Sequence, residues 1–389
     1  MGLKAVMLVQ KIGPYHHARF ERAAKDGDLS VIEFRPGDEV YAWAPVTGTA
    51  PYERLETRSA LELREALARL RPEVVICVGY ANTEIHHALH WAVARRIPLV
   101  LCSDSTRDDE PRVAWREAIK SKLVSVFGAG LVAGARARAY LHDLGMAENL
   151  QFLAWDVVDN DYFVWGAATA RTNPSVERAR LKLPEKYFLC VARFVPKKNL
   201  ARLISAYAQY RAAAGREAWS LVLSGSGPLE EELRVGVKVA GVADKVVFPG
   251  FLQYPELPTY YGLAGALVLP SISDQWGLVV NEAMAAGLPV LVSERCGCAA
   301  DLVEQGFNGF AFDPRDQVQL TRYLTLVATM SAEDRETMGN RSRELVQRFS
   351  LDIFSQGLWA AVGLARKNRN VAPKMFARIL ISLLRLRAY

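Results

Sequence analysis

The stretch PSISDQWGLVVNEAMAAGLP, residues 270–289, passes from a strand through a loop into a helix. The apolar run at residues 265–271 predicts a buried strand, and the residues after Gly277 are mostly good helix formers. Gly287, with Pro289 two residues later, is typical of a helix end. The stretch therefore predicts a strand–loop–helix unit of an α/β fold.

The same alternation recurs along the chain. Helix-like segments such as residues 59–70 and 199–214 separate short apolar runs that end in small or turn-forming residues. These runs span residues 5–10, 74–80, 98–103, 187–194, 220–224, 246–252, 265–271 and 289–293. Apolar strands that alternate with helices are typical of parallel sheets covered on both faces. We therefore expect doubly wound, Rossmann-like domains.

The chain has 389 residues, which is long for one domain and suits two of about 150 to 200 residues. The alternation stops at residues 166–184, where small, polar and basic residues indicate a linker. We expect two domains that face a cleft. The expected parts are a first domain (1–170), a linker (171–184), a second domain (185–350), a helix crossing back to the first domain (351–367) and a basic amphipathic tail (368–389).

Ligands of doubly wound sheets bind beyond the carboxyl ends of the strands. In the opening stretch, Gly277 leaves the first helix amides, those of Leu278 and Val279, accessible to a diphosphate. Glu282 is placed to accept hydrogen bonds from a vicinal diol such as a ribose, and Asp274 to face the hydroxyls of a sugar. The alternative is that Asp274 caps the helix and Glu282 lies on its solvated face.

Two more loops follow strands in the second half. In VARFVPKKNL, residues 191–200, Arg193 and Lys198 can neutralise a diphosphate, although an ordinary basic loop is the alternative. In SGSGP, residues 224–228, Gly225 and Gly227 let a nucleobase or a backbone segment come close. The turn lacks the third glycine of a dinucleotide fingerprint, and no Walker-type GxxxxGK[ST] motif occurs, so nicotinamide and P-loop ATP chemistry are disfavoured.

The net charge of +6 is concentrated at the C-terminus. Residues 366–389 carry seven cations and no acid, which leaves 41 basic against 42 acidic residues in the rest of the chain. A near-neutral body argues against nucleic-acid binding. We expect no nucleic-acid partner.

Cysteine and histidine usage argues against disulfides and metals. The five cysteines are an odd number in apolar runs, no secretory signal precedes them, and only Cys296 and Cys298 lie close together. The six histidines have no matching spacing. We expect a cytoplasmic protein without a bound metal, and no apolar run is long enough to span a membrane.

In order and spacing, these loops resemble glycosyltransferase family 4. The family pattern is a strand followed by Arg and Lys, then a glycine turn, then two carboxylates separated by seven residues that include a glycine. The matching residues are Arg193, Lys198, Gly225, Gly227, Asp274 and Glu282, with further matches at Val158, Asp159, Phe163, Gly250, Pro270, Ser271, Asn308 and Gly309. The resemblance covers about residues 156–313. It implies the GT-B fold, an activated sugar donor, retention of anomeric configuration and no required metal.

The chain departs from the family pattern twice. Asp274 stands where the family usually has Glu, and its side chain is shorter by one C–C bond, about 1.5 Å. The family often carries a His after an N-domain strand, whereas residues 102–105 read CSDS. Asp104 or Ser105 takes that place here, and a carboxylate at this point can act as the base of an inverting reaction.

The first half has fewer informative residues. Gly13, in the first strand–helix turn, lets the donor phosphate or the acceptor approach. His16 and His17 either contact the acceptor or are solvated on a surface helix. The charged residues 107–112 either orient a polar acceptor or form a structural ion-pair cluster.

The resemblance implies transfer of a sugar from a nucleoside diphosphate sugar, with UDP or GDP, to a hydroxyl of a glycan or lipid-linked saccharide in cell-surface polysaccharide or glycoconjugate synthesis. The first domain is expected to bind the acceptor and the second the donor. Arg193 and Lys198 stabilise the leaving diphosphate, Asp274 the donor sugar and Glu282 the ribose, with Asp104 beside the reacting groups. The alternatives are a GT-B nucleotide-sugar epimerase or hydrolase, and a catalytically silent GT-B binding subunit.

The tail reads as a basic amphipathic helix. Its apolar stripe is Phe376, Ile379, Leu380, Leu383 and Leu384, with Lys374, Arg378 and Arg385 opposite. Such a helix can lie on an anionic membrane, which predicts a peripheral position at the inner face of the membrane. The alternative is that the stripe packs against the first domain.

Overall fold

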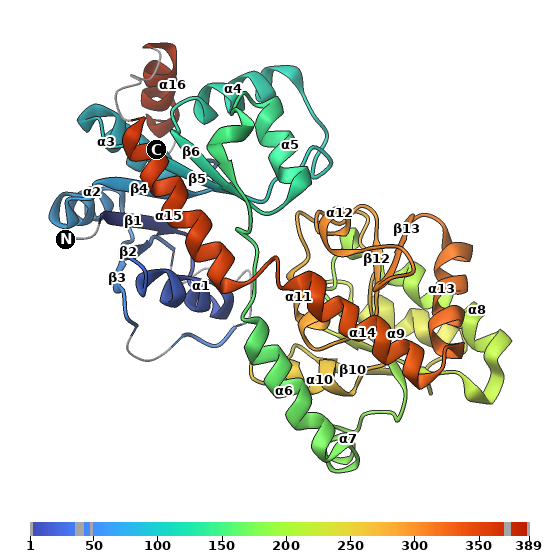
Figure 1. Ribbon diagram of the computed structural model, residues 1–389. Coiled ribbons are helices and arrows are strands. Elements are labelled where there is room, and N and C mark those ends of the chain that lie inside the picture. Colours follow the sequence, from blue (N-terminus) through green and yellow to red (C-terminus); the bar gives the residue numbers. More distant parts are fainter. Residues whose placement is uncertain (1–2, 36–42, 47–49, 369–374, 387–389) are drawn as a thin grey trace. The chain divides into compact units, whose positions relative to one another are not determined.

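The computed structural model describes residues 3–35, 43–46, 50–368 and 375–386. The chain folds as two compact units (Figure 1). The first comprises Met1–Val158 and Phe349–Tyr389, and the second Asp159–Arg348.

The first unit is built on a parallel sheet of seven described strands in the order β3-β2-β1-β4-β5-β6-β7. The strands are β1 (Lys4–Val9), β2 (Asp28–Glu33), β3 (Glu53–Glu56), β4 (Val74–Val78), β5 (Leu99–Ser103), β6 (Ala129–Val132) and β7 (Gln151–Phe152). Its helices are α1 (Pro14–Ala24), α2 (Ala60–Leu70), α3 (Thr83–Arg95), α4 (Ala114–Val124), α5 (Ala135–Asp143), α15 (Leu351–Lys367) and α16 (Met375–Leu386).

The second unit has a parallel sheet of six described strands in the order β10-β9-β8-β11-β12-β13. The strands are β8 (Tyr187–Val191), β9 (Ser220–Ser224), β10 (Val246–Gly250), β11 (Ala266–Leu269), β12 (Val290–Ser293) and β13 (Gly309–Phe312). The helices are α6 (Asn160–Thr172), α7 (Pro174–Leu181), α8 (Leu200–Ala214), α9 (Glu230–Val239), α10 (Leu257–Leu263), α11 (Leu278–Ala285), α12 (Ala299–Leu302), α13 (Gln317–Thr329) and α14 (Ala332–Val346).

Both sheets have the doubly wound strand order. The order reverses between β1 and β4 in the first unit and between β8 and β11 in the second. The expected fold class, two doubly wound parallel-sheet domains, is therefore confirmed. The loops that follow these four strands lie at the two switch points, where such folds bind ligands.

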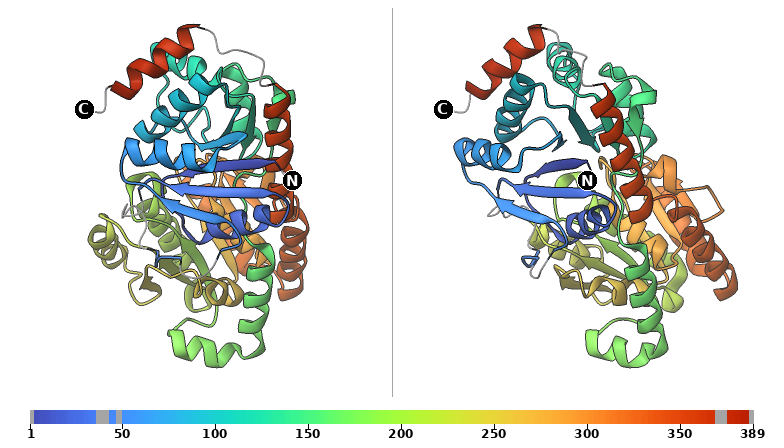
Figure 2. Two further views of the ribbon diagram at one scale, coloured as in Figure 1. Left: turned by 90° about the vertical axis from the view of Figure 1, so that its left-hand side faces the viewer. Right: turned by 60° about the vertical axis from the view of Figure 1, so that its left-hand side comes forward.

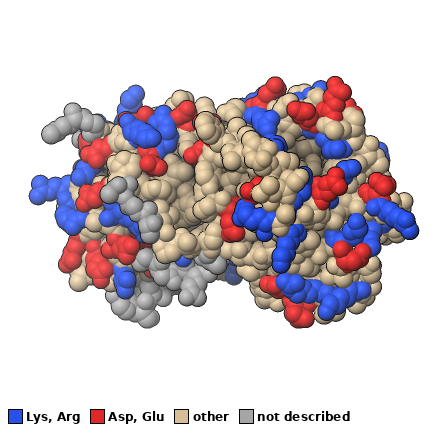
Figure 3. Space-filling model, turned by 90° about the horizontal axis from the view of Figure 1, so that it is seen from below, with Lys and Arg blue, Asp and Glu red and all other residues tan. Residues whose placement is uncertain are grey.

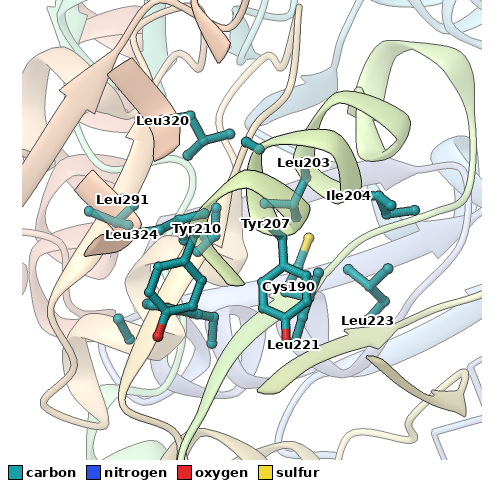
Figure 4. Close-up of a cluster of buried hydrophobic side chains, with 14 of the residues drawn as sticks. Cys190, Leu203, Ile204, Tyr207, Tyr210, Leu221, Leu223, Leu291, Leu320 and Leu324 are labelled. Atoms are coloured by element: carbon teal, nitrogen blue, oxygen red, sulfur yellow. The ribbon is translucent and has the colours of Figure 1, made fainter. Parts of the chain in front are cut away.

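One hydrophobic cluster of the second unit lies between its sheet and helices α8 and α13. Figure 4 shows Tyr207 and Tyr210 among the aliphatic side chains of this cluster. The Tyr207 hydroxyl donates to the Trp219 carbonyl at 2.9 Å, and the Trp219 amide donates to the Tyr210 hydroxyl at 2.8 Å. These bonds satisfy the polar tips of buried rings, so the tyrosines pack as core residues.

The expected linker has a different structure. Residues 171–184 include the end of α6 and all of α7, and α6 belongs to the second unit from Asp159 onwards. The small residues of this region allow close helix packing, because a Cβ at Gly166 would lie 2.3 Å from the Pro258 Cβ and one at Gly262 would lie 2.8 Å from the Ala167 Cα. The unit boundary therefore falls at residue 158 rather than at 170.

The chain returns to the first unit at Phe349. Helix α15 packs against α1, and its Ser355 hydroxyl donates to Asp26 at 2.6 Å. Its Trp359 indole donates to the Ala23 carbonyl at 2.9 Å. The segment expected to cross back, residues 351–367, is thus a helix of the first unit.

Acidic and basic side chains are interspersed over the face drawn in Figure 3. This mixture fits the near-neutral charge of the body. Among the described residues, no helix combines the length and the apolar character that a membrane crossing requires.

Candidate active site

Two loops meet at the switch point of the second unit. The loop after β8 contains a short 3-10 turn, Pro196–Lys198, and the loop after β11 contains Asp274. The Ile272 amide donates to the Lys197 carbonyl at 2.8 Å. The Asn199 side chain donates to the Pro270 and Pro314 carbonyls at 3.1 and 2.9 Å. These bonds fix the basic loop against the loop that follows β11.

Lys198 and Asp274 form an ion pair at this junction. Their side chains are 12% and 13% exposed, so the pair is shielded from most of the solvent. The Ser271 hydroxyl also donates to the Asp274 Oδ2, at 3.4 Å. The structure therefore brings together Lys198, which the sequence predicts to contact the diphosphate, and Asp274, which it predicts to contact the sugar of the same donor. Arg193, half-buried, follows β8 in the same loop.

Helix α11 begins beside this pair. Gly277 is its N-cap residue, with φ 105, and no side chain caps the helix. The alternative in which Asp274 caps the helix is therefore wrong. A Cβ at Gly277 would lie 2.9 Å from Leu269 Cδ2 and 3.9 Å from Asp274 Oδ2, so a larger residue would crowd the loop. Leu278 and Val279, the first helical residues, are partly exposed.

Gly297 supports the Asp274 loop, and the sequence analysis missed it. The Gly297 amide donates to the Asp274 carbonyl at 2.9 Å, and the Cys298 amide to the Trp276 carbonyl at 3.2 Å. A Cβ at Gly297 would lie 1.7 Å from the Gln275 carbonyl oxygen. In the sequence, the glycine between Cys296 and Cys298 was the feature that could have pointed to this role. Both cysteines are buried, and no group of potential metal ligands occurs among the described residues.

Glu282 is fully buried in α11. Its Oε2 accepts a hydrogen bond of 2.6 Å from the hydroxyl of Tyr261, which is also fully buried. The alternative that places Glu282 on a solvated helix face is therefore wrong. The rings of Phe163 and Tyr261 meet edge to face at 5.9 Å, and Phe163 also contacts Tyr254. An aromatic cluster thus adjoins the carboxylate.

The glycine turn packs on the basic loop. Gly225 and Gly227 have φ angles of 141° and 153°. A Cβ at Gly225 would lie 1.8 Å from the Ala192 carbonyl oxygen, and one at Gly227 would lie 2.6 Å from the Phe194 carbonyl oxygen. The Phe194 amide donates to the Ser226 carbonyl at 2.8 Å. The segment that lies close to Gly225 and Gly227 is therefore the protein's own backbone in the basic loop.

In the first unit, Gly13 is the N-cap of α1 and its amide donates to His16 Nδ1 at 3.4 Å. The His16 ring also stacks on Phe20, with centroids 5.8 Å apart. Burial, and then the charge of Arg19, lower the pKa of His16 to about 3, so the ring is neutral. His17 instead bonds the Tyr52 hydroxyl at 2.9 Å. Both histidines are therefore held by the fold rather than freely solvated.

Asp104 follows β5 and lies within electrostatic reach of the buried Arg19. Arg19 donates to the Trp155 carbonyl at 2.5 Å and pairs with Asp156 at 3.5 Å. Burial lowers the pKa of Arg19, whereas the charges of Asp156 and Asp104 act in the opposite direction. The carboxylate expected near the reacting groups thus has a buried cation as its neighbour.

The charged residues 107–112 form structural contacts. Arg107 pairs with Asp143 at 2.9 Å, and Asp109 accepts hydrogen bonds from the amide and the hydroxyl of Thr106. Arg112 donates to the Tyr140 hydroxyl at 2.9 Å. Of the two interpretations, these contacts favour the ion-pair cluster.

Comparison with known proteins adds to this geometry. Residues 174–345, which lie within the second unit, match the family model of the glycosyl transferases group 1. Over 202 residues the chain is 32% identical to a GDP-mannose-dependent alpha-(1-6)-phosphatidylinositol monomannoside mannosyltransferase of Mycobacterium tuberculosis, with 48% of this chain and 51% of that protein covered. It is 27% identical over 168 residues to the 2-deoxystreptamine N-acetyl-D-glucosaminyltransferase of Streptomyces fradiae, with 43% and 40% covered. The chain thus spans about half the length of these relatives or less.

Solved structures resemble nearly the whole chain. The Anabaena protein HepE, in complex with UDP and glucose, superposes with a TM-score of 0.75 at 18% identity and covers 93% of this chain and 99% of its own. Sucrose-phosphate synthase from Thermosynechococcus elongatus gives 0.72 at 19% identity, with 92% and 98% covered. The fold is therefore GT-B.

Proposed function

We propose that this protein is a glycosyltransferase that moves a sugar from a nucleoside diphosphate sugar to a hydroxyl of a glycan or lipid-linked saccharide. One observation carries the proposal. The Lys198–Asp274 pair lies at the switch point of the second unit, beside the glycine N-cap of α11, and inside the segment that matches the group 1 glycosyl transferases. Cell-surface polysaccharide or glycoconjugate synthesis fits an acceptor of this class.

Arg193 and Lys198 stabilise the diphosphate as charge develops on it. A well-placed donor at such a position is worth about 3 to 4 kcal/mol in the transition state. The Lys198 ammonium carries three donors, so it can hold a phosphate oxygen and Asp274 together. The amides of Leu278 and Val279 add the positive end of the α11 dipole.

Asp274 orients the donor sugar, and its pairing with Lys198 holds the carboxylate in position. Glu282 holds the ribose, which requires local movement because the carboxylate is fully buried with Tyr261. Gly225 and Gly227 shape the turn beside the basic loop.

Calorimetry distinguishes the roles of the two carboxylates. Glu282→Gln should weaken binding of the free nucleoside diphosphate, whereas Asp274→Asn should alter sugar selectivity. Equal affinity losses would contradict the division.

The family 4 resemblance supports retention, in which the leaving phosphate takes the proton of the acceptor hydroxyl. Gly13, at the start of α1, leaves room for the donor phosphate or the acceptor, since a Cβ there would only touch Trp43 at 3.8 Å. Asp104 would be the base of an inverting reaction. The anomeric configuration of the product, measured by NMR, decides: inversion together with an inactive Asp104→Asn variant would overturn retention.

The donor is a UDP-sugar or a GDP-sugar. The mycobacterial relative is named for GDP-mannose and for a phosphatidylinositol mannoside acceptor, which supports a sugar nucleotide and a lipid-linked acceptor.

We propose that the reaction needs no cofactor and no metal. Turnover should persist in excess EDTA, and loss of activity that Mg²⁺ or Mn²⁺ restores would contradict this.

A thermal-shift screen with UDP- and GDP-sugars, followed by turnover assays with saccharide acceptors, tests the function. Bound nucleotide sugar and a glycosylated product are expected. Release of free sugar without any acceptor would instead identify a nucleotide-sugar epimerase or hydrolase. Binding without turnover on any acceptor would identify a silent binding subunit.

A further inference from the structure

Helix α16 packs on the first unit through a face that the sequence did not single out. It contacts α3 and α4, and both views in Figure 2 show it (dark red) against the helices of this unit. Ala377 and Ile381, one turn apart, are each 1% exposed. Neither belongs to the apolar stripe expected from the sequence. The side chains of Lys374, Phe376, Arg385 and Arg387 lie outside the described part of the chain.

The opposite face of α16 is apolar and exposed. Ile379 and Leu383 are 50% and 58% exposed. Each lies two residues beyond a buried position, which is roughly 200° around a helix of about 3.6 residues per turn. The helix therefore has two apolar faces, of which only one is covered by the first unit. An exposed apolar face of this kind indicates an interaction surface.

Helix α4, which contacts α16, also exposes apolar surface. Trp115 is 60% exposed and Val113, just before the helix, is 38% exposed. The Arg116 guanidinium lies 5.3 Å from the centroid of the Trp115 ring, and Lys122, two turns after Trp115, is exposed. Tryptophan beside basic residues is typical of the boundary between water and lipid, because one part of the ring is apolar and its N–H is polar.

The charges on α4 and α16 favour an anionic partner. Residues 366–389 contain no acid. The carboxylate of α4, Glu117, is already engaged by Lys120 at 2.9 Å and by the Tyr140 hydroxyl at 2.7 Å. Within the described residues, the three exposed cations of the two helices have no ion-pair partner. These cations are Arg116, Lys122 and Arg378.

We propose that α16 and α4 form a surface that docks on an anionic lipid bilayer. Ile379, Leu383 and Trp115 enter the boundary region of the bilayer, and the cations contact the lipid phosphates. This surface belongs to the first unit, so it is separate from the donor residues of the second. The inference is independent of glycosyl transfer, although a bilayer would hold the lipid-linked acceptor proposed above.

Sedimentation of the full-length protein with vesicles tests the apolar contacts. The Ile379→Ser/Leu383→Ser variant should bind phosphatidylglycerol-containing vesicles at least tenfold more weakly than the wild type. Its thermal unfolding should be unchanged, because both side chains are exposed. The matched control is Val239→Ser/Val318→Ser, which removes valines that are 83% and 73% exposed in the second unit and should bind normally.

The two exposed tryptophans give a second matched pair. Trp115→Ala should weaken vesicle binding, whereas Trp165→Ala, on α6 of the second unit and 77% exposed, should not. Replacing each of the three cations by Gln should cost about fivefold per cation. Wild-type binding should fall with salt and be weak on phosphatidylcholine alone.

Three results would overturn the proposal. They are equal binding to neutral and anionic vesicles, equal losses in the test and control variants, and a dimer that the Ile379→Ser/Leu383→Ser change dissociates without any vesicle binding in the wild type. The last would assign the surface to a second copy of the chain. Turnover on a soluble acceptor is measured in parallel, so failure of the catalytic proposal is seen separately.

Discussion

Lys198 and Asp274 are adjacent in space although 76 positions separate them in the sequence. If Lys198 also neutralises the departing diphosphate, Lys198→Ala should lower turnover by on the order of a hundredfold, because a single transition-state donor is worth about 3 to 4 kcal/mol. Steady-state kinetics checks this. Lys197 is the matched control, since it is the neighbouring lysine and is exposed. Lys197→Ala should remain close to wild type, and equal losses in the two variants would refute a specific role.

His16 links stability to pH. Its pKa is about 3 in the folded protein and about 6.5 in the unfolded chain, so below pH 6.5 the unfolded chain binds a proton that the folded protein does not. The contribution of His16 to stability is complete above pH 6.5 and is lost as the pH falls toward 3. Urea unfolding at pH 7.5, 6 and 5 should show a shallower decrease for His16→Asn than for the wild type. Parallel decreases would contradict this.

At the scale of elements, the glycine turn after β9 and the loop after β8 form one unit. Gly225→Ala places a Cβ 1.8 Å from the Ala192 carbonyl oxygen at a φ of 141°, so we expect a loss of about 2 kcal/mol or more in the free energy of unfolding. Gly236→Ala is the control. Gly236 lies within α9 with no atom within 4 Å of a Cβ, and the change should raise the stability by up to about 1 kcal/mol.

Denaturant unfolding of both variants distinguishes these outcomes. Nucleoside diphosphate binding, measured by calorimetry, should weaken only in Gly225→Ala, because the turn supports the loop that carries Arg193. A stable Gly225→Ala variant with normal binding would show that the turn tolerates a side chain.

At the scale of the molecule, the two units differ in how they are assembled from the chain. The second unit is continuous, whereas the first needs the C-terminal segment. Helix α15 contributes buried side chains to the first unit, namely Phe354, Leu358, Ala361, Val362 and Ala365. We expect residues 159–348 to fold alone and bind a nucleoside diphosphate, and residues 1–158 to require α15, since an exposed apolar face on the sheet favours aggregation.

Circular dichroism and urea unfolding of the separate fragments check this expectation. Residues 159–348 should unfold in one cooperative transition. An unfolded 159–348 fragment, or a stable 1–158 fragment, would show that the division into units does not describe how the chain folds.

The sequence by itself determined the fold class and the residues that meet at the switch point of the second unit. Apolar runs such as residues 220–224 identify strands because the apolar character of a few consecutive residues is sufficient to recognise a buried strand. The strand order explains why Lys198 and Asp274 meet, since the carboxyl ends of β8 and β11 lie side by side. The sequence did not reveal β2, β3, β6, β7 or β13. The ERLE of β3, for example, carries a weak apolar signal.

Only the tertiary structure decided what each side chain is buried against. The small residues around Gly166 read as a linker, yet they permit α6 to pack closely on α10. The sequence predicts Glu282 as a ligand contact, with a solvated position as the alternative. Its burial beside Tyr261 depends on the packing of α10 against α11, which the sequence does not show. In α16, the sequence marks the apolar side chains, but only the contacts with α3 and α4 decide that Ala377 and Ile381 are covered while Ile379 and Leu383 stay exposed. The physical reason is that backbone preferences act over a few residues, whereas burial depends on segments that meet only after the chain has folded.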